Sequence, residues 1–342
     1  MSRGNNLEEK EVTMLLKRFG LLFMIMLVGI AVTACSADDP KEMRDVTVML
    51  DWTPNTNHAG IYLAKHKGWY EAEGINLSII EPAEVGVEAA VAAGTAHFGF
   101  SYSEYVIPAR QMDVNVVSIA AVMPYNDSSL MLLESAGVSR PRDLAGKLYG
   151  GWGGLLETHL VKTLVACDGG DADTVEFVEV GNVPAVESME ANRFDFVWEY
   201  EGWGVIRSRE LLGRQITTLR FSDYFECIPN WYTPVIITGD KLIDADSGLV
   251  EDFLAVTRRG YTEAGEDPSA SALALTSLAP ELDAKLVELA AIYHADKYRD
   301  GNKKWGIQKK DVWEEFSEFL LDAGYLESAP DVGSNWTNDY LP

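Results

Sequence analysis

The sequence has few basic residues, few cysteines and no apolar run long enough to cross a membrane. Its 342 residues contain 28 lysines and arginines against 53 aspartates and glutamates. This acidity repels nucleic acids and anionic lipid headgroups, so neither is an expected partner. The three cysteines and five scattered histidines lack the spacing of a metal motif, so no metal site is expected. The apolar run at 19–34 has sixteen residues, fewer than the roughly 20 that a membrane-spanning helix requires.

The N-terminus has the pattern of a secretory signal. Two basic residues precede the apolar run at 19–34, and small residues lead to Cys35. A cysteine at that position resembles the bacterial lipobox. It implies a signal peptide at 1–34, a lipidated Cys35 and an anchor on the extracytoplasmic (periplasmic or extracellular) face of the cell membrane. An uncleaved anchor with a chance cysteine is the alternative, and either Met1 or Met14 is the start.

Strand-like and helix-like segments alternate along the rest of the chain. Strands are expected at 46–50, 75–80, 97–100, 114–122, 130–133, 147–150, 174–178, 194–198 and 216–219. After residue 248 only helices are expected, at 249–264, 269–278, 282–291 and 310–323. This order predicts parallel α/β lobes, because a β-sandwich or a helical bundle would lack the alternation.

No flexible linker follows residue 45, so two lobes would be joined by crossing strands. Crossings are expected near Met123-Pro124 and near Pro234-Val235. The predicted organisation is a tether at 35–44, a first lobe at 45–124 plus 235–342, and a second lobe at 125–234. In an oxidising compartment Cys167 and Cys227 either pair or remain free thiols, and the sequence leaves both outcomes open.

A run of aromatic and amide residues follows the first expected strand. Asp51–Gly60 reads DWTPNTNHAG, and a strand end that delivers such side chains to a helix start suits a small planar ligand. The run resembles the opening of the periplasmic-type binding proteins that supply thiamine-pyrimidine precursors to ABC importers. It also resembles the related fungal thiamine-pyrimidine synthase. Trp52, Asn57 and His58 are therefore candidate ligand contacts. Their alternative roles are a core cap, a helix cap and a hydrogen-bonded helix-start histidine.

A second candidate segment, Gly99–Tyr105, also leads from a strand into a helix. Ser101, Tyr102 and Glu104 could offer polar groups to a ligand, although Glu104 could instead cap the helix. In the fungal synthase, the positions that match Ser101 and Tyr105 carry the lysine that binds pyridoxal phosphate and the histidine that is consumed. The synthase's cysteine-rich motif retains a single cysteine here. The resemblance therefore implies a binding protein without enzymatic activity and without a cofactor.

The second lobe contributes two further candidate segments. Trp152, Gly153 and Gly154 belong to a glycine loop that resembles the family's loop and lacks the dinucleotide fingerprint; a plain tight turn is the alternative. Glu199 and Glu201 end a strand, followed by Trp203. Strand side chains alternate, so one of the two acids should face the ligand, and the sequence does not decide which. A hydrolytic acid pair is a weaker interpretation of these acids.

The expected crossings carry the last candidates. Tyr125, Asn230 and Tyr232 lie beside them, where an aromatic ring either closes over a flat ligand or fills the seam between lobes. The resemblance extends from the opening run to the closing GSNWTNDYL motif at 333–341, which we interpret as structural docking of the tail. It implies a type II periplasmic-binding fold with a crossover-strand hinge.

The resemblance also implies a function. The expected protein is a lipid-anchored solute-binding protein that closes on a small heteroaromatic ligand, formylaminopyrimidine or hydroxymethylpyrimidine, and delivers it to ABC permease subunits. Riboflavin or another heteroaromatic ligand on the same scaffold is the closest alternative. A sulfonate or nitrate ligand is disfavoured, because no arginine occurs among the candidate contacts. A pyrimidine synthase is the alternative from another functional class.

Overall fold

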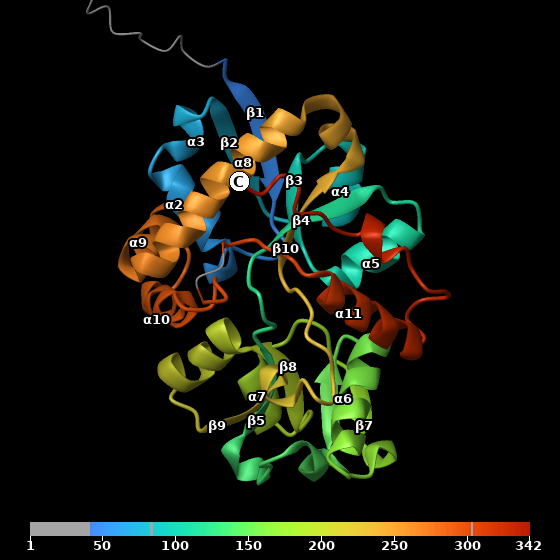
Figure 1. Cartoon of the computed structure of the whole chain (residues 1–342). Helices are drawn as coiled ribbons and strands as arrows, with labels where there is room; N and C mark the ends of the chain where they lie inside the picture. Colours follow the sequence, from blue (N-terminus) through green and yellow to red (C-terminus); the bar gives the residue numbers. More distant parts are fainter. Residues whose placement is uncertain (1–41, 83–84, 302–303) are drawn as a thin grey trace, which may run out of the picture. The chain divides into compact units, whose positions relative to one another are not determined.

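Two five-stranded sheets organise the part of the chain that the computed structural model describes, residues 42–82, 85–301 and 304–342. Figure 1 shows one sheet in the upper half of the view and the other in the lower half. Residues 43–342 form one compact unit. The expected signal peptide, both candidate start residues, Cys35 and most of the tether lie outside the described residues. No helix within the described ranges has the length and apolar content to span a membrane.

The first sheet has the strand order β2-β1-β3-β10-β4. Its strands are β1 (Arg44–Met49), β2 (Ile75–Ile80), β3 (Phe98–Ser101), β4 (Val116–Ala121) and β10 (Val235–Gly239). The strand β1 is parallel to β2 and β3, whereas β10 is antiparallel to β3 and β4.

The second sheet has the order β7-β6-β8-β5-β9. Its strands are β5 (Ser128–Leu133), β6 (Leu148–Gly151), β7 (Glu176–Glu179), β8 (Phe196–Tyr200) and β9 (Ile216–Arg220). The strand β5 is antiparallel to β8 and β9. Both sheets are therefore mixed, and the expectation of parallel lobes was wrong in this respect. The antiparallel strands β5 and β10 are those that enter from the other sheet, so no βαβ crossover sets their direction.

Helices cover both sheets. Those before β5 are α2 (Ala59–His66), α3 (Trp69–Ala72), α4 (Val87–Ala93) and α5 (Ser103–Gln111). The second sheet carries α6 (Leu155–Cys167) and α7 (Ala185–Glu190), with π-helical turns η5 (Glu201–Val205) and η6 (Arg207–Leu211). After β10 follow α8 (Asp240–Glu266), α9 (Pro268–Leu278), α10 (Ala284–His294) and α11 (Lys310–Asp322).

The helix α8 starts nine residues before the helix expected at 249–264. Its backbone is non-helical at Asp246 (φ −155°, ψ 71°), and the Asp246 carboxylate accepts a hydrogen bond from the Leu249 N–H at 2.9 Å. The expected start at 249 is thus the beginning of the second part of a kinked helix, with Asp246 acting as its local cap.

Glycines permit the crossing of α2 and α8, which covers the first sheet. A Cβ at Gly260 would lie 2.1 Å from the Gly60 carbonyl oxygen, and a Cβ at Gly60 would lie 2.3 Å from the Tyr261 ring. The Tyr261 hydroxyl donates to the Asn57 carbonyl at 2.5 Å. This crossing therefore fixes the start of α2, and with it the loop that follows β1.

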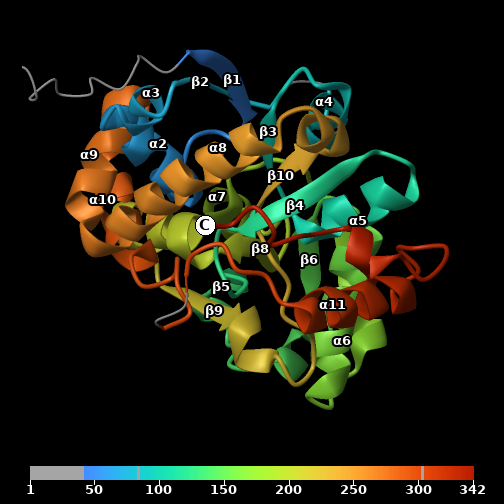
Figure 2. The ribbon, with the colours of Figure 1, turned by 45° about the horizontal axis from the view of Figure 1, so that its top comes forward.

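Two segments connect the sheets: the first connecting segment is 122–127 and the second is 221–234. Hydrogen bonds join the two segments. The Asn230 side chain accepts a hydrogen bond from the Asn126 N–H and donates one to the Pro124 carbonyl, each at 3.0 Å. A disulfide joins Cys167 at the end of α6 to Cys227, which answers the question that the sequence left open. In addition α11 lies beside α6 in both views, and His159 contacts Phe319 edge-on at 4.7 Å (Figures 1 and 2).

The closing motif docks onto the first sheet. The Ser118 N–H of β4 donates to the Asn335 carbonyl, and the Thr337 N–H donates to the Ser118 carbonyl, both at 2.9 Å. These bonds extend the β4 edge by a short parallel bridge, as expected for structural docking of the tail.

Candidate ligand-binding site

A buried acid–histidine pair lies at the carboxyl end of β1. The His58 imidazole accepts a hydrogen bond from the Asn55 N–H at Nδ1 (3.2 Å), so its Nε2 carries the proton and donates to Asp51 at 2.6 Å. Burial opposes ionisation of Asp51, but His58 and a hydrogen bond from the Tyr102 hydroxyl outweigh it and hold the pKa of Asp51 below its usual range. The pair therefore orients Tyr102, and His58 has no free donor for a ligand.

Four further side chains, from both sheets, meet beside Asp51 of this pair, and we call the five together the junction cluster. They are Asp51, Tyr102 and Glu104 from the first sheet's side, Tyr200 from the end of β8, and Thr233 from the second connecting segment. Burial and the nearby Asp51 and Glu104 carboxylates raise the pKa values of Tyr102 and Tyr200 well above the ordinary range. Both phenols therefore stay protonated at physiological pH, and the Tyr102 proton is directed to Asp51.

Glu104 is the acid of this cluster that has neither a histidine nor a cation beside it among the described residues. It is 8% exposed, and one carboxylate oxygen has no hydrogen-bond partner. Burial raises the pKa of Glu104 to about 8; the Trp231 indole partly offsets this effect, and Glu88 adds to it. Glu104 does not cap α5, because the N-cap residue of that helix is Tyr102. The junction cluster thus combines neutral phenols, the ionised Asp51 and the buried Glu104, and no lysine or arginine in the described part of the chain acts on its two acids.

Exposed aromatic rings flank the junction cluster. Trp52 directly follows Asp51 and is 44% exposed, whereas Trp152 follows β6 and is 59% exposed. Tyr105 is also exposed, and its phenol lies within electrostatic range of both Glu104 and Glu157, the residue that binds the Trp152 N–H. Each sheet therefore contributes an exposed aromatic ring directly after a strand, and exposed rings of this kind can stack on a flat ligand.

The glycine loop is already engaged by a side chain of the protein. The Trp152 and Gly154 N–H groups donate to the Glu157 carboxylate at 2.9 and 3.3 Å. Gly153 has φ of +81°, a conformation that favours glycine, and a Cβ there would lie 3.1 Å from Glu179. Glu157 thus occupies the oriented donors at the start of α6, so Trp152 is the group of this loop that remains available.

The structure separates the two acids of β8. Glu201 is buried between Arg209 and Arg220, each at 3.7 Å. Glu199 is half-buried, and a Cβ on Gly204 would lie 1.9 Å from its carboxylate. Burial raises the pKa of Glu199 to about 7, with Arg207 partly offsetting the rise. Because side chains alternate along β8, Glu199 projects from the face opposite Tyr200, which reaches the junction cluster.

Several other candidates have protein partners. Ser101 donates a hydrogen bond to Glu88. Asn57 is half-buried, and the residue that caps the helix start is Asn55, not Asn57. Trp203 packs against the hydrophobic core of the first sheet. Asn230 holds the connecting segments together, as described above.

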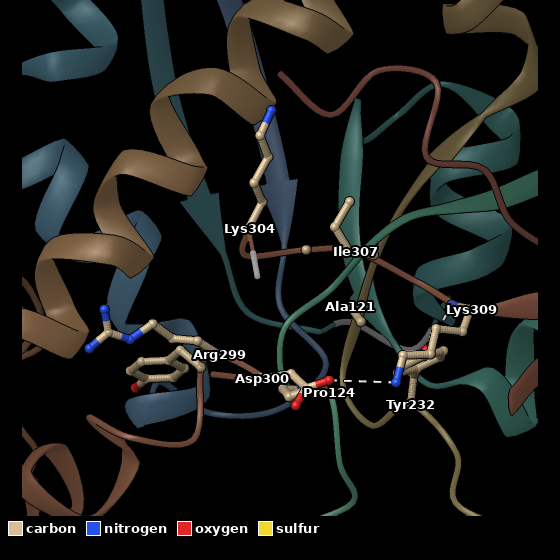
Figure 3. A pocket seen from close by; sticks show the side chains of 10 residues that line it. Ala121, Pro124, Tyr232, Arg299, Asp300, Lys304, Ile307 and Lys309 are labelled. Atoms are coloured by element: carbon tan, nitrogen blue, oxygen red, sulfur yellow. Dashed lines mark hydrogen bonds and ion pairs between the residues drawn. The ribbon is translucent and has the colours of Figure 1, made fainter. Parts of the chain in front are cut away.

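The side chains of the aromatic residues at the crossings have partners within the protein. Tyr125 is exposed and its hydroxyl donates to Asp300 at 3.3 Å. Tyr232 is buried, and its hydroxyl accepts from the Lys309 N–H at 2.9 Å. It lines a cavity of about 20 Å³, beside the Asp300–Lys309 ion pair in Figure 3. That volume holds about one water molecule and is too small for a heterocycle.

Asp51, Tyr200 and Thr233 are site residues that were not among the candidates expected from the sequence. Asp51 begins the run that was singled out, and its position at a strand end was a usable signal. Tyr200 lies between Glu199 and Glu201. Alternation from buried Phe196 and half-buried Trp198 places it on their face of β8 only once the covered face of the strand is known. The described residues contain no group of three or more histidines, cysteines and acids that could hold a metal ion.

Comparisons with known proteins agree in family and in fold. A formylaminopyrimidine-binding protein of Halalkalibacterium halodurans is 26% identical over 91% of this chain and 94% of its own. A 4-amino-5-hydroxymethyl-2-methylpyrimidine phosphate synthase of Legionella pneumophila is 22% identical over 87% of this chain and 92% of its own. A riboflavin-binding protein of Chloroflexus aurantiacus is 23% identical over 94% of this chain and 97% of its own.

Solved structures establish the fold class. The periplasmic aliphatic sulphonate binding protein SsuA of Escherichia coli superposes with a TM-score of 0.65, at 13% identity, over 85% of this chain and 91% of its own. The fold is therefore the two-lobed α/β fold of the periplasmic binding proteins, as predicted. The sequence profile of the NMT1/THI5-like family matches residues 55–271. The chain belongs to the NMT1/THI5-like family.

Proposed function

We propose that the protein is the extracytoplasmic, lipid-anchored solute-binding component of an ABC importer and that its ligand is a thiamine-pyrimidine precursor. The carrying observation is the junction cluster, where hydroxyl and carboxyl groups from both sheets come together, with exposed aromatic rings at the ends of β1 and β6. The relative that binds formylaminopyrimidine matches almost the whole chain and supports this ligand class. Formylaminopyrimidine and hydroxymethylpyrimidine are both flat rings with polar edges, which such a junction suits.

In this proposal the residues divide into three roles. Trp52 and Trp152 stack on the ring, while Tyr102, Glu104 and Tyr200 contact its polar edge. His58, Asn57 and Asn230 position these groups, because their own hydrogen bonds are made within the protein. We further propose that the parts 45–124 plus 235–342 and 125–234 close on the ligand as two lobes.

We propose that the protein is not a synthase. Ser101 and Tyr105 stand where the fungal enzyme carries its cofactor lysine and its consumed histidine, and neither can form the lysine's Schiff base. Riboflavin is the second candidate ligand, since the riboflavin-binding relative spans 94% of this chain.

Thermal unfolding of the purified protein with each compound tests the proposal. A bound ligand at about 100 times its dissociation constant stabilises by about 2.7 kcal/mol, which raises the melting temperature visibly. We expect formylaminopyrimidine or hydroxymethylpyrimidine to raise it, and riboflavin not to. The variant Trp52→Ala should lose most of the rise. The control Met112→Ala, at a residue 71% exposed at the end of α5, should keep it. A rise with riboflavin alone would replace the ligand, and no rise with any of them would refute the proposed function.

A further inference from the structure

Glu104 is enclosed by side chains from several elements. It is the second residue of α5 and is 8% exposed. The titratable groups that face it are Glu88 from α4, Tyr102 and Tyr105 next to it in the chain, Tyr200 from β8, and Tyr325 after α11. None of these groups is a cation. An ionised carboxylate in this position would be buried without a counter-charge and next to another acid.

One buried oxygen of this acid is unsatisfied. The Trp231 indole acts on Glu104 and the Thr233 hydroxyl on Tyr200, whereas one Glu104 oxygen is buried and has no hydrogen-bond partner among the described residues. Glu104, Trp231 and Thr233 are more than nine-tenths buried, and they lie where the second connecting segment passes between the sheets. Buried polar groups are nearly always hydrogen-bonded, so the unsatisfied Glu104 oxygen at this junction indicates a bound polar molecule as its missing partner.

We propose that Glu104 contacts the ligand as a neutral carboxylic acid. Its O–H donates to a ring nitrogen that carries no hydrogen, and its carbonyl oxygen accepts from an adjacent amino group. The ligand class is therefore an uncharged heteroaromatic amine that presents an acceptor and a donor side by side. This inference rests on the proposed function and adds the protonation state of the site to it.

The charge environment supports this assignment. A carboxylate offers two acceptors and no donor, so it cannot satisfy a bare ring nitrogen; the neutral acid can satisfy both atoms of the ligand edge. The pKa of about 8 makes Glu104 largely protonated at pH 7. Raising the pH through that value removes the proton from the free protein, so binding must weaken as the pH rises.

Isothermal titration of the purified protein with formylaminopyrimidine and hydroxymethylpyrimidine from pH 6.5 to 9.5 tests the inference. Loss of one required proton with a pKa of about 8 makes the dissociation constant about tenfold larger at pH 9 than at pH 7. Glu104→Gln supplies an amide donor and acceptor without a titratable proton. The affinity of this variant should therefore stay constant from pH 6.5 to 9.5 and lie within about threefold of the wild-type affinity at pH 7. Glu104→Ala should bind weakly throughout.

Controls separate this effect from other titrations. The ligand's own protonation is measured by absorbance without protein, and Glu327→Gln, at an exposed acid, should reproduce the wild-type curve. Infrared difference spectra at pH 7 should show a neutral carboxyl band that Glu104→Gln lacks, and its absence would overturn the inference. So would wild-type affinity that is constant or rises with pH, or a parallel fall in Glu104→Gln. Such results, with a pyrimidine bound at pH 7, leave the proposed function standing, whereas no binding at any pH refutes both.

Discussion

At the residue scale, the Asp51–His58 pair shows how a candidate ligand contact becomes a positioning group. His58 has an imidazole proton, which made it a plausible donor, but that proton is directed to Asp51. Asp51 in turn binds the Tyr102 hydroxyl. The pair is also fixed to the start of α2, because His58 is the N-cap residue of that helix and accepts a hydrogen bond from the Asn55 N–H. Its effect on a ligand is therefore carried by Tyr102 and by the adjacent Trp52.

Asp51→Asn should destabilise the protein by about 1–3 kcal/mol at pH 7, because it removes a charged acceptor of two buried hydrogen bonds. The pKa of Asp51 is lowered in the folded state, so its contribution is present above about pH 4 and is lost as the pH falls below that value. Urea unfolding at pH 7, 5 and 3.5 should show the difference from wild type shrinking at the lowest pH. Exposed Asp45→Asn should change stability by no more than about 0.5 kcal/mol at any of them. An equal loss at all three pH values would contradict the assignment.

At the element scale, the crossing of α2 and α8 holds the loop that carries Trp52. The two helices touch through backbone atoms at Gly60 and Gly260, which brings the Tyr261 hydroxyl to the Asn57 carbonyl. A sequence pattern identifies each helix, but the glycines acquire their role only when the two helices meet.

Gly260→Ala should cost about 1–3 kcal/mol, because its Cβ would lie 2.1 Å from the Gly60 oxygen and the helices must separate. The matched control is Gly248→Ala in the same helix, where the nearest atom would be 3.5 Å away. That change should be neutral or stabilising by up to about 1 kcal/mol. Urea midpoints measure both variants. A similar loss in the two would show that helix propensity, and not the crossing, sets the effect.

At the scale of the whole described unit, a polar network joins α10 to the second sheet. The Asp127 carboxylate accepts from the Tyr293 hydroxyl at 2.6 Å and from the Gly202 N–H at 2.9 Å, and His294 lies 3.6 Å from it. His294 also bonds Thr56 at 2.8 Å. Burial and Asp127 raise the pKa of Tyr293, so this hydroxyl remains a donor at physiological pH. The network therefore favours the arrangement in which the two sheets approach each other.

Tyr293→Phe should favour a more open arrangement, because it removes a hydrogen bond to a carboxylate worth about 1.5–3 kcal/mol. Without ligand, Tyr293→Phe should have a larger radius of gyration than the wild type, and it should bind the pyrimidine more weakly. At saturating ligand the difference in radius of gyration should be smaller. Small-angle X-ray scattering and calorimetry measure these effects. Tyr340→Phe, at a tyrosine without a hydrogen bond among those described, should match the wild type. An unchanged radius of gyration with weaker binding would argue against a role in closure.

Much of the fold followed from local pattern, while the site followed only in part. The expected strands agree to within a few residues with β1 to β9, since the alternation of apolar runs and helical stretches is a local property. The sequence also located the segments that meet at the junction: the ends of β1, β3 and β8. It did not identify Tyr200, because alternation at a strand end cannot be assigned without knowing which face is covered.

The sequence by itself determined the acidic surface, the family resemblance, the α/β class and the strand ends that carry the candidate residues, because each depends on composition or on neighbours in the chain. Only the tertiary structure decided that His58 binds Asp51, that Glu201 pairs with two arginines, and that Cys167 pairs with Cys227. It also decided that Glu104 is buried without a counter-charge. The partner and the burial of a side chain depend on how segments distant in the sequence pack together. No single position in the sequence determines how the two sheets pack around the two connecting segments.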